Sequence, residues 1–593
     1  MINLEPKNRV NLIKCAMGEI LADLCITNVQ LVNVMTGEVY PADVYVYEGY
    51  VAHVEYLNPG QGVEAQEVVD GKGEFLIPGF IDSHIHIESS MLTPRNFARG
   101  VINHGTTTAI TDPHEIANVY GIEAVAYMHE ASEGLPMRQL INIPSCVPAV
   151  PGLEHSGAEF GVKEIEELSK LERVVGLAEV MDNMGVIRGE KRMMDIMDAA
   201  RKAGIYLQGH APFMSGRGLS AYAIGGARTC HESRLPEEFL EKMRVGIAVD
   251  VRESSITCNA AAGVSGTRGV KCFDNFCVCT DDREADDILN KGHLNIVVRR
   301  LIECGMDPIL AIKSATFNNA KAAKLDNLGA IAPGYVADMQ IVKSLAELKP
   351  RQVYFEGKLV SENGQLVTPI EEKSFPLEGK NSIRLTKTFE LEDFMFKTDV
   401  AEGQVNVNVM TYPTLELAAT KCVQEALDVV DGKLDIRSDE HLKYVMVINR
   451  YGRGTVGYGV VRGFGSNQGA MASTVSHDCH NITVVFDTPE NAKKAVDTLV
   501  QMGGGFVCVV NEQVEATIEL AVGGLMSVKP AQDVAKACEN MKEALTKIGF
   551  NKEPNPLLRI VTLALPVIPE IKMSDLGYVD VFAKKHLPLY VTD

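Results

Sequence analysis

Eight short apolar segments alternate with helix-like segments between residues 80 and 282, and this alternation constrains the fold more than any other feature. The apolar segments are FIDSHIHI, TTTAITDPHE, QLINIPSCVPA, VVGLAEVMD, IYLQGHAP, RTCHES, VGIAVDVRE and FCVCTDD. Stretches with the helical spacing of apolar residues, such as KEIEELSKL, KRMMDIMDAARKA and LPEEFLEKM, lie in the gaps. Strand-helix alternation of this kind predicts an α/β fold, a TIM-like (β/α)8 barrel over residues 78–330.

The segments on either side of the barrel have a different pattern of apolar and polar residues. Residues 1–22 predict an N-terminal helical segment. Residues 23–77 alternate apolar and polar side chains, as in ADVYVYEGYVAHVEYL, and residues 331–375 return to that pattern. We expect these two pieces to pair into one flanking β-sandwich-like domain. Residues 395–593 mix strand-like segments such as KYVMVINRYG with helix-like ones such as AQDVAKACENMKEALTKIG, which predicts a C-terminal α/β domain.

Composition and charge narrow the class of protein. The chain has 593 residues and 46% hydrophobic residues, with no apolar run near the roughly 18 residues of a membrane span. Its N-terminus lacks the uninterrupted apolar core of a secretion signal, and thirteen cysteines without a small-scaffold spacing fit a reducing compartment, so we expect a cytoplasmic protein. A formal charge of −21 repels a phosphate backbone, so the expected partner is a small molecule, with no nucleic acid and no membrane.

Histidines and acids stand at the ends of six of the eight predicted strands. Catalytic groups of such barrels sit at the carboxyl ends of the strands. In the first segment the two histidines are two residues apart, so both can project from one face of a strand toward one ion. The imidazoles and carboxylates together are the ligand types that suit Zn²⁺, Mn²⁺ or Fe²⁺. In strand order the residues are His84 and His86; Asp112, His114 and Glu115; Glu179; His210; His231; Asp281 and Asp282.

This pattern resembles the amidohydrolase superfamily of metal-dependent hydrolases over roughly residues 23–375. The resemblance implies that His84 and His86 hold one metal, that His210 and His231 hold a second, and that Asp281 contacts metal and the nucleophilic water. Many members bridge their metals with a carboxylated lysine on the fourth strand, where this chain has Glu179 in GLAEVMD. A glutamate presents two oxygens to two cations directly, so Glu179 is the expected bridging ligand.

Further motifs narrow the resemblance. With TDPHEIANVYG, GLAEVMD, QGHAP and CTDD together, and with an appended C-terminal domain, the chain is similar to the adenine deaminases of bacteria over nearly its whole length. That similarity implies hydrolysis of adenine to hypoxanthine and ammonia in purine salvage. It also implies two divalent ions per chain, Mn²⁺ or Fe²⁺ before Zn²⁺, and a homodimer.

The chemistry of adenine deamination assigns further roles. A metal-bound water has a pKa near 7 in zinc enzymes, so hydroxide is available to attack C6 of the purine. The ring nitrogen must be protonated during attack, and Glu115 is the candidate general acid. Asp281 is expected to take the proton of the water and deliver it to the departing ammonia. Asp282 is the weaker candidate for that role because adjacent strand residues face opposite sides, and it is assigned to the substrate pocket with Asp112, His114 and Glu115.

Other interpretations stay open. Glu115 could be an acid stabilised by a helix N-terminus, and Asp112 could cap the following turn. His477 and His480 have a spacing that could hold another metal, but no third and fourth ligands stand nearby in the sequence. The same metal chemistry could act on guanine or another heterocycle or cyclic amide, and a barrel that had lost its ligands could be a non-catalytic scaffold.

Overall fold

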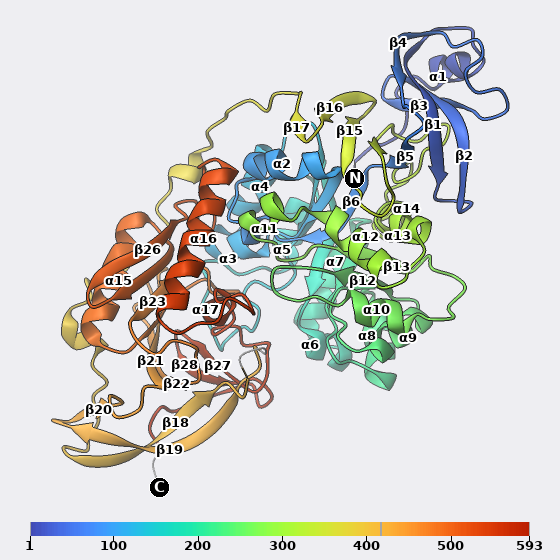
Figure 1. Cartoon of the computed structure of the whole chain (residues 1–593). Coiled ribbons are helices and arrows are strands. Elements are labelled where there is room, and N and C mark those ends of the chain that lie inside the picture. The colour runs from blue at the N-terminus through green and yellow to red at the C-terminus, as the bar shows by residue number, and fades with distance from the viewer. Residues whose placement is uncertain (1, 415–417, 592–593) are drawn as a thin grey trace.

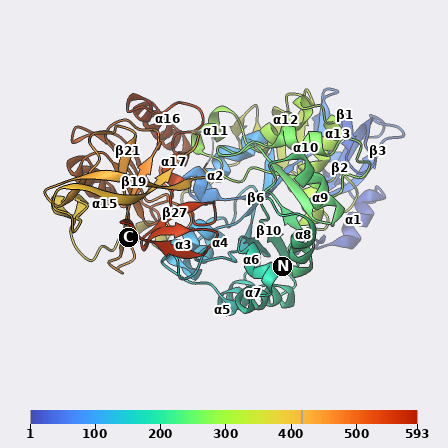
Figure 2. The same cartoon turned by 90° about the horizontal axis from the view of Figure 1, so that it is seen from below.

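The computed structural model describes residues 2–414 and 418–591. It has three parts, which Figure 1 separates along the long axis of the molecule. A barrel occupies the middle, a β domain built from both sides of the barrel sequence lies at one end, and the C-terminal domain lies at the other. The view from below in Figure 2 keeps the same order, so the barrel contacts both other domains while they lie apart from each other.

The barrel is built from parallel strands that follow one another in chain order. Strands β6 to β10 pair as neighbours in one arc, and β11 to β13 pair in a second arc. The arcs meet where Arg228 N–H donates to Leu207 O at 3.2 Å and where Asp281 N–H donates to His84 O at 3.0 Å. This closed order confirms the predicted (β/α)8 barrel. The strands are β6 (Phe80–Ile85), β7 (Thr106–Thr111), β8 (Arg138–Ile143), β9 (Val174–Val180), β10 (Tyr206–Gly209), β11 (Thr229–Cys230), β12 (Ala248–Arg252) and β13 (Phe276–Cys279).

Helices cover the outside of the barrel, so every residue of β6 to β13 is buried. Burial on both faces explains why the strand sequences read as nearly continuous apolar runs. The helices are α2 (Pro94–Val101), α3 (His114–Tyr120), α4 (Ile122–Ala131), α5 (Val162–Leu168), α6 (Asn183–Arg188), α7 (Lys191–Lys202), α8 (Gly216–Gly225), α9 (Pro236–Arg244), α10 (Ala260–Gly266), α11 (Ala285–Asn290), α12 (Leu294–Glu303), α13 (Pro308–Ser314) and α14 (Phe317–Ala322).

One buried asparagine stabilises the seam between the first and last strands. Asn319 on α14 donates its amide to Ile81 O at 2.6 Å and to Val278 O at 2.7 Å, and it accepts from Val278 N–H at 3.2 Å. These bonds link backbone groups of β6 and β13 through one side chain across the buried seam. The seam therefore stays closed directly below the histidines of β6.

The β domain combines strands from before and after the barrel in one sheet. Its order is β17-β16-β15-β14-β5-β1-β2-β3, with β4 beside β1. Strand β5 runs through Pro78-Gly79 into β6, and a Cβ at Gly79 would lie 2.4 Å from Thr107 Oγ1, so only glycine fits this junction. The elements are α1 (Arg9–Ala16), β1 (Ala22–Asn33), β2 (Glu38–Tyr47), β3 (Tyr50–Glu55), β4 (Ala65–Asp70), β5 (Phe75–Pro78), β14 (Met339–Val342), β15 (Pro350–Phe355), β16 (Lys358–Glu362) and β17 (Gln365–Leu366).

The C-terminal domain has a mixed sheet in the order β20-β19-β18-β22-β21-β24-β23-β25-β26. Phe389 and Phe394, which precede the first strand, pack into the core of this sheet. The elements are β18 (Gly403–Thr411), β19 (Lys421–Val430), β20 (Lys433–Asp435), β21 (Leu442–Ile448), β22 (Val456–Arg462), β23 (Ala470–Ser473), β24 (Ile482–Phe486), α15 (Pro489–Met502), β25 (Gly505–Val510), β26 (Gln513–Glu519), α16 (Ala531–Lys547), α17 (Leu558–Val561), β27 (Ile571–Ser574), β28 (Gly577–Asp580) and β29 (Lys585–Leu587).

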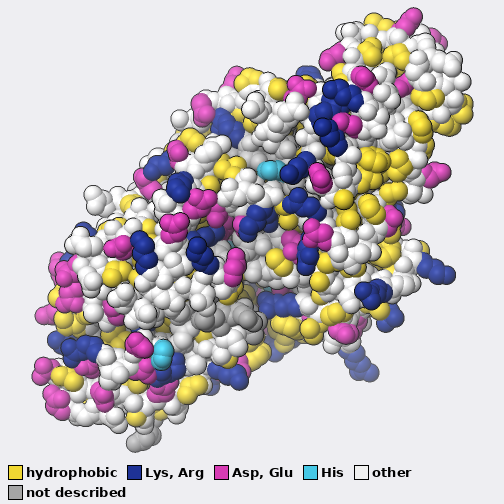
Figure 3. All heavy atoms as spheres, viewed as in Figure 1, with side chains coloured by type: hydrophobic (Ala, Val, Ile, Leu, Met, Phe, Trp, Pro, Cys, Tyr) yellow, Lys and Arg dark blue, Asp and Glu magenta, His cyan; other side chains and the backbone are white. Residues whose placement is uncertain are grey.

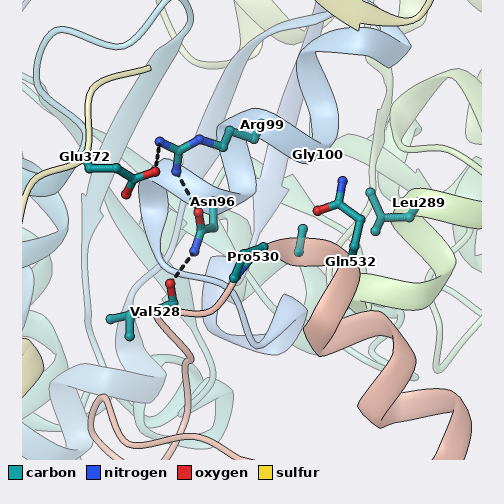
Figure 4. Close-up of a pocket in the computed structure, with 9 residues that line it drawn as sticks. Asn96, Arg99, Gly100, Leu289, Glu372, Val528, Pro530 and Gln532 are labelled. Carbon is teal, nitrogen blue, oxygen red and sulfur yellow. Dashed lines mark hydrogen bonds and ion pairs between the residues drawn. The ribbon is translucent and has the colours of Figure 1, made fainter. Parts of the chain in front are cut away.

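Helix α16 attaches the C-terminal domain to the barrel. Its Lys542 lies 2.6 Å from Glu284 and 2.7 Å from Asp286 at the start of α11. Beside this contact, Asn96 of α2 donates to Val528 O at 3.1 Å across a small pocket of about 300 Å³ (Figure 4). The two domains are therefore joined by charged and polar contacts next to the barrel mouth.

Surface charge and helix length are two further features of the structure. Acidic and basic side chains are interspersed over the face in Figure 3. Within the described residues, every helix is too short or too polar to span a bilayer.

Candidate active site

A cavity of about 1210 Å³ opens at the carboxyl ends of the barrel strands and reaches the C-terminal domain. Its barrel wall carries histidines and acids that follow the strands, and its other wall comes from the loop between β23 and β24 and from the 550–569 segment. Active sites of (β/α)8 barrels lie at this end, so the cavity is the candidate active site.

His84 and His86 from β6 point into the same region. Their Nε2 atoms lie 3.4 Å and 3.3 Å from Asp281 Oδ1. Nδ1 of His84 lies 3.0 Å from Gln208 Oε1, and Nδ1 of His86 lies 3.0 Å from the carbonyl oxygen of Asp112. These acceptors fix the proton on Nδ1, which leaves each Nε2 lone pair free for a cation.

Glu179 on β9 lies between two pairs of histidines. Its Oε1 is 3.4 Å from His86 Nε2, while its Oε2 is 3.1 Å from His231 Nε2 and 2.5 Å from His210 Nδ1. Each oxygen thus faces a different histidine pair, as a bridging carboxylate requires. We call His84, His86, Glu179, His210, His231 and Asp281 the principal centre.

The donor set of the principal centre fits two divalent cations. His84 Nε2 is buried and has no hydrogen-bond partner, which suits an atom that binds metal. Burial is the largest cause that lowers the pKa of His231 to about 4, so this imidazole is neutral, as a ligand must be. Two overlapping groups of donors, one around His84, His231 and Asp281 and one around Glu179, His210 and His231, each lie within 4.8 Å.

Asp281 has a cationic partner that the sequence analysis missed. Arg252, at the end of β12, contacts Asp281 Oδ2 and lies 2.5 Å from Glu232. Burial alone would raise the pKa of Asp281, but the charge of Arg252 and the bonds with His84 and His86 hold it well below its usual range. The carboxylate therefore stays ionised and is available as a ligand and proton acceptor.

The expectation that Asp282 faces away from Asp281 is wrong. Strand β13 ends at Cys279, and Asp281 has a φ of 58°, so the alternation of side chains along a strand no longer applies. Donor atoms of His86, Asp281 and Asp282 all lie within 4.8 Å of one another. Asp282 also accepts from Ser89 Oγ at 2.6 Å and lines the cavity beside Asp281.

Asp112, His114 and Glu115 form the turn between β7 and α3. Asp112 Oδ1 accepts from the backbone N–H of His114 at 3.1 Å, which confirms that it caps this turn. Its Oδ2 lies 3.2 Å from His114 Nδ1, and the opposite ring nitrogen, Nε2, lies 3.3 Å from Glu115 Oε1. His114 therefore stands between the principal centre and Glu115.

Residues of the C-terminal domain converge on Glu115. His477 Nδ1 lies 2.6 Å from Glu115 Oε1, and His480 Nε2 contacts Glu115 Oε2. Asp478 Oδ1 lies 3.7 Å from His114 Nε2. We call His114, Glu115, His477 and Asp478 the interdomain cluster. The sequence analysis found no further ligands for His477 and His480 because their neighbours lie more than 350 positions earlier in the chain.

The contacts of Glu115 bear on its expected role as a general acid. Burial would raise the pKa of this carboxyl group, but His477, His480 and His114 hold it well below its usual range. An ionised carboxylate has no proton to give. The geometry thus favours Glu115 as an acceptor of hydrogen bonds or a ligand.

Comparison with known proteins agrees with this geometry. Residues 75–360 match the amidohydrolase family, and residues 418–585 match the adenine deaminase C-terminal domain. An adenine deaminase of Methanothrix thermoacetophila is 39% identical over 583 residues, which cover 98% of this chain and 99% of that protein. The chain belongs to the adenine deaminase family.

A second adenine deaminase also matches most of the chain, and solved structures match part of it. An adenine deaminase of Halalkalibacterium halodurans is 37% identical over 565 residues, 94% of each chain. Among solved structures, a β-aspartyl dipeptidase of Fervidobacterium islandicum is 19% identical, with a TM-score of 0.45 over 60% of this chain and 100% of that chain. The adenine deaminase relatives match both the barrel and the C-terminal domain. Both walls of the cavity therefore come from parts of the chain that this family shares.

Three residues near the principal centre were not predicted from the sequence. Gln208 orients His84, while Arg252 and Glu232 surround Asp281. Glu232 directly follows His231 and could have been noted as one more acid at a strand end. Gln208 and Arg252 could not, because each lies within a buried strand and only the closed barrel turns its side chain toward the centre.

Proposed function

We propose that this chain hydrolyses adenine to hypoxanthine and ammonia with two divalent cations at the principal centre. The observation that carries the proposal is the position of Glu179, whose two oxygens face different histidine pairs in a chain of the adenine deaminase family. The fit of the donor set to two cations supports the same conclusion.

The residues of the principal centre would have the following roles. His84, His86, His210 and His231 would hold the cations with Glu179 between them. When bound, the cations lower the pKa of a coordinated water, so that hydroxide is available at neutral pH. Asp281 would accept a proton from this water and pass it to the amino group at C6. Water adds at C6 and ammonia leaves, so adenine and water give hypoxanthine and ammonia.

We place the purine ring on the side of the cavity lined by His114, Glu115 and Asp282, with Asp112 orienting His114. Carboxylates there can accept hydrogen bonds from ring N–H groups. Asp282 lines the cavity beside Asp281, so its carboxylate is the one placed to accept a hydrogen bond from a ring N–H group.

The test is an ammonia-release assay over free bases and nucleosides with enzyme of defined metal content. Adenine should be turned over well and adenosine poorly. Strong turnover of guanine without turnover of adenine would exclude the substrate and leave the metal-dependent hydrolase intact. No turnover of any heterocycle by a fully metallated protein would favour a non-catalytic scaffold.

Metal identity, assembly and location are further parts of the proposal. The imidazole and carboxylate donors suit Mn²⁺ or Fe²⁺, and they accept Zn²⁺. We propose a homodimer, supported by the exposed apolar residues Val10 and Ile13 on α1 and Met17 directly after it. Thirteen free cysteines support a reducing, cytoplasmic location. Metal analysis and light scattering test the first two.

A further inference from the structure

The interdomain cluster brings four metal-binding side chains together outside the principal centre. His114 and Glu115 come from the start of α3 in the barrel, and His477 and Asp478 come from the loop between β23 and β24. Each offers a donor atom, and these atoms lie within 4.8 Å of one another. All four side chains are buried, with exposed fractions of 1% to 8%. Half of this cluster therefore belongs to each domain.

The distances within the cluster match those of the principal centre. Nε2 of His114 lies 3.3 Å from Glu115 Oε1 and 3.7 Å from Asp478 Oδ1, and His477 Nδ1 lies 3.6 Å from Asp478 Oδ1. In the principal centre the corresponding separations between donors run from 3.1 to 4.0 Å, apart from one shorter contact of 2.5 Å. Ligands about 2.0–2.2 Å from one tetrahedral ion lie at such separations from each other.

Hydrogen bonding does not account for the closest approach in the cluster. Glu115 Oε1 is buried without a hydrogen-bond partner, although His477 Nδ1 is only 2.6 Å away. The ring N–H direction of His477 therefore misses this oxygen. Oδ2 of Asp478 is likewise buried and unpartnered. Buried carboxylate oxygens without donors are costly, and a cation between them removes that cost.

A neighbouring histidine orients one of the donors. Nδ1 of His114 lies 3.2 Å from Asp112 Oδ2, but neither atom has a hydrogen-bond partner. His480 Nδ1 accepts from Ser476 N–H at 3.2 Å, so its Nε2–H donates to Glu115 Oε2 and leaves Oε1 free. A carboxylate held by a donor in this way is a usual support of a metal site.

The two carboxylates of the cluster need positive charge nearby. Among the described residues, every ion pair of Glu115 and Asp478 has a histidine as its partner. Two buried carboxylates are therefore balanced either by protonated histidines or by a metal ion.

We propose that His114, Glu115, His477 and Asp478 bind a third divalent cation, which joins the barrel to the C-terminal domain. Two imidazoles and two carboxylates suit Zn²⁺, Mn²⁺ or Fe²⁺, whereas Ca²⁺ and Mg²⁺ prefer oxygen ligands alone. The site differs from the principal centre because four protein donors fill it, as in structural metal sites. The proposed third site does not depend on which substrate the enzyme uses.

The experiment counts metal ions per chain. Full-length protein is saturated with Mn²⁺, passed through a desalting column and analysed by mass spectrometry of the metal. The wild-type chain should retain three equivalents, while His477→Ala and Asp478→Asn should each retain two. His441→Ala is the matched control, because His441 is an exposed histidine of the same domain, and this variant should retain three. Anomalous diffraction at the manganese edge should give a separate peak among the four side chains.

Two equivalents in the wild-type chain, with no anomalous peak at the cluster, would overturn the proposal and assign the charge balance to protonated histidines. Three equivalents retained by both His477→Ala and Asp478→Asn would also overturn it. The result is separable from the proposed function, because Glu179→Gln should empty the principal centre and leave the interdomain ion bound.

Discussion

The principal centre and the interdomain cluster use the same kinds of side chain but are assembled differently. The principal centre takes its donors from the ends of strands in one closed barrel, where strand pairing sets their positions. The interdomain cluster takes half of its donors from a helix start in the barrel and half from a loop of another domain. The first should therefore tolerate changes at the domain interface, while the second should depend on docking of the domains.

The largest expected effect is that of Glu179→Gln. This change keeps the size of the side chain but removes the charge that screens two dications about 3.5–4 Å apart. Deamination should be abolished, and the principal centre should lose both ions together in metal analysis. Reconstitution of the wild-type enzyme should need no bicarbonate, since the bridging carboxylate is permanent. A fully metallated and active variant would show that another group bridges.

Asp281→Asn should separate chemistry from metal binding. The histidines and Glu179 remain, so most of the metal should stay, but the proton carrier is gone. We expect kcat to fall by about 10²–10⁴-fold, the usual contribution of a general acid or base. Parallel measurement of kcat and metal content checks this. Equal losses of both would mean that Asp281 acts mainly as a ligand.

Gln208→Leu and His480→Leu sharpen the comparison between the two sites. Each removes a group that orients one donor, His84 in the principal centre or Glu115 in the interdomain cluster. Metal affinity at the corresponding site should fall by about 10–100-fold, with the other site unchanged. Titration of the apoprotein with Mn²⁺ measures both. A loss at both sites from either change would contradict their independence.

The smallest effect on catalysis is expected from Lys542→Met at the domain interface. Burial would lower the pKa of Lys542, but Glu284 and Asp286 raise it, so the pair of acids depends on this charge. Its loss should lower the free energy of unfolding by about 3 kcal/mol, because Glu284 and Asp286 lose their shared cation in a largely buried contact.

The same variant should weaken the interdomain ion while the principal centre keeps its two metals. Lys536→Met is the control, since Lys536 on the same helix is 65% exposed and, within the part of the chain that the structure describes, pairs only with Glu539. Urea unfolding and metal analysis give the readouts. Equal destabilisation by both variants would exclude a specific role for the Lys542 contact.

Comparison of the two sites also explains which parts of the protein could be predicted. The side chains that meet in the principal centre could be predicted because strand alternation places His84 and His86 on one face and barrel topology places each strand end at one mouth. The orientation of Asp282 was predicted wrongly because Asp281 lies beyond the end of β13 with a positive φ. The contacts of Gln208 and Arg252 could not be predicted, since a single polar residue in a buried strand does not indicate which residue it contacts.

The amino-acid sequence by itself determined the barrel and the identity of its strand-end donors, because hydrophobic periodicity and strand order are local and repeat along the chain. The tertiary structure alone decided that Glu115 meets His477 and His480, because no local pattern relates residues separated by more than 350 positions. That contact depends on how α16 docks the C-terminal domain against α11. Docking is set by side-chain packing and charge across the interface between the two domains. The sequence of either domain by itself does not specify these contacts.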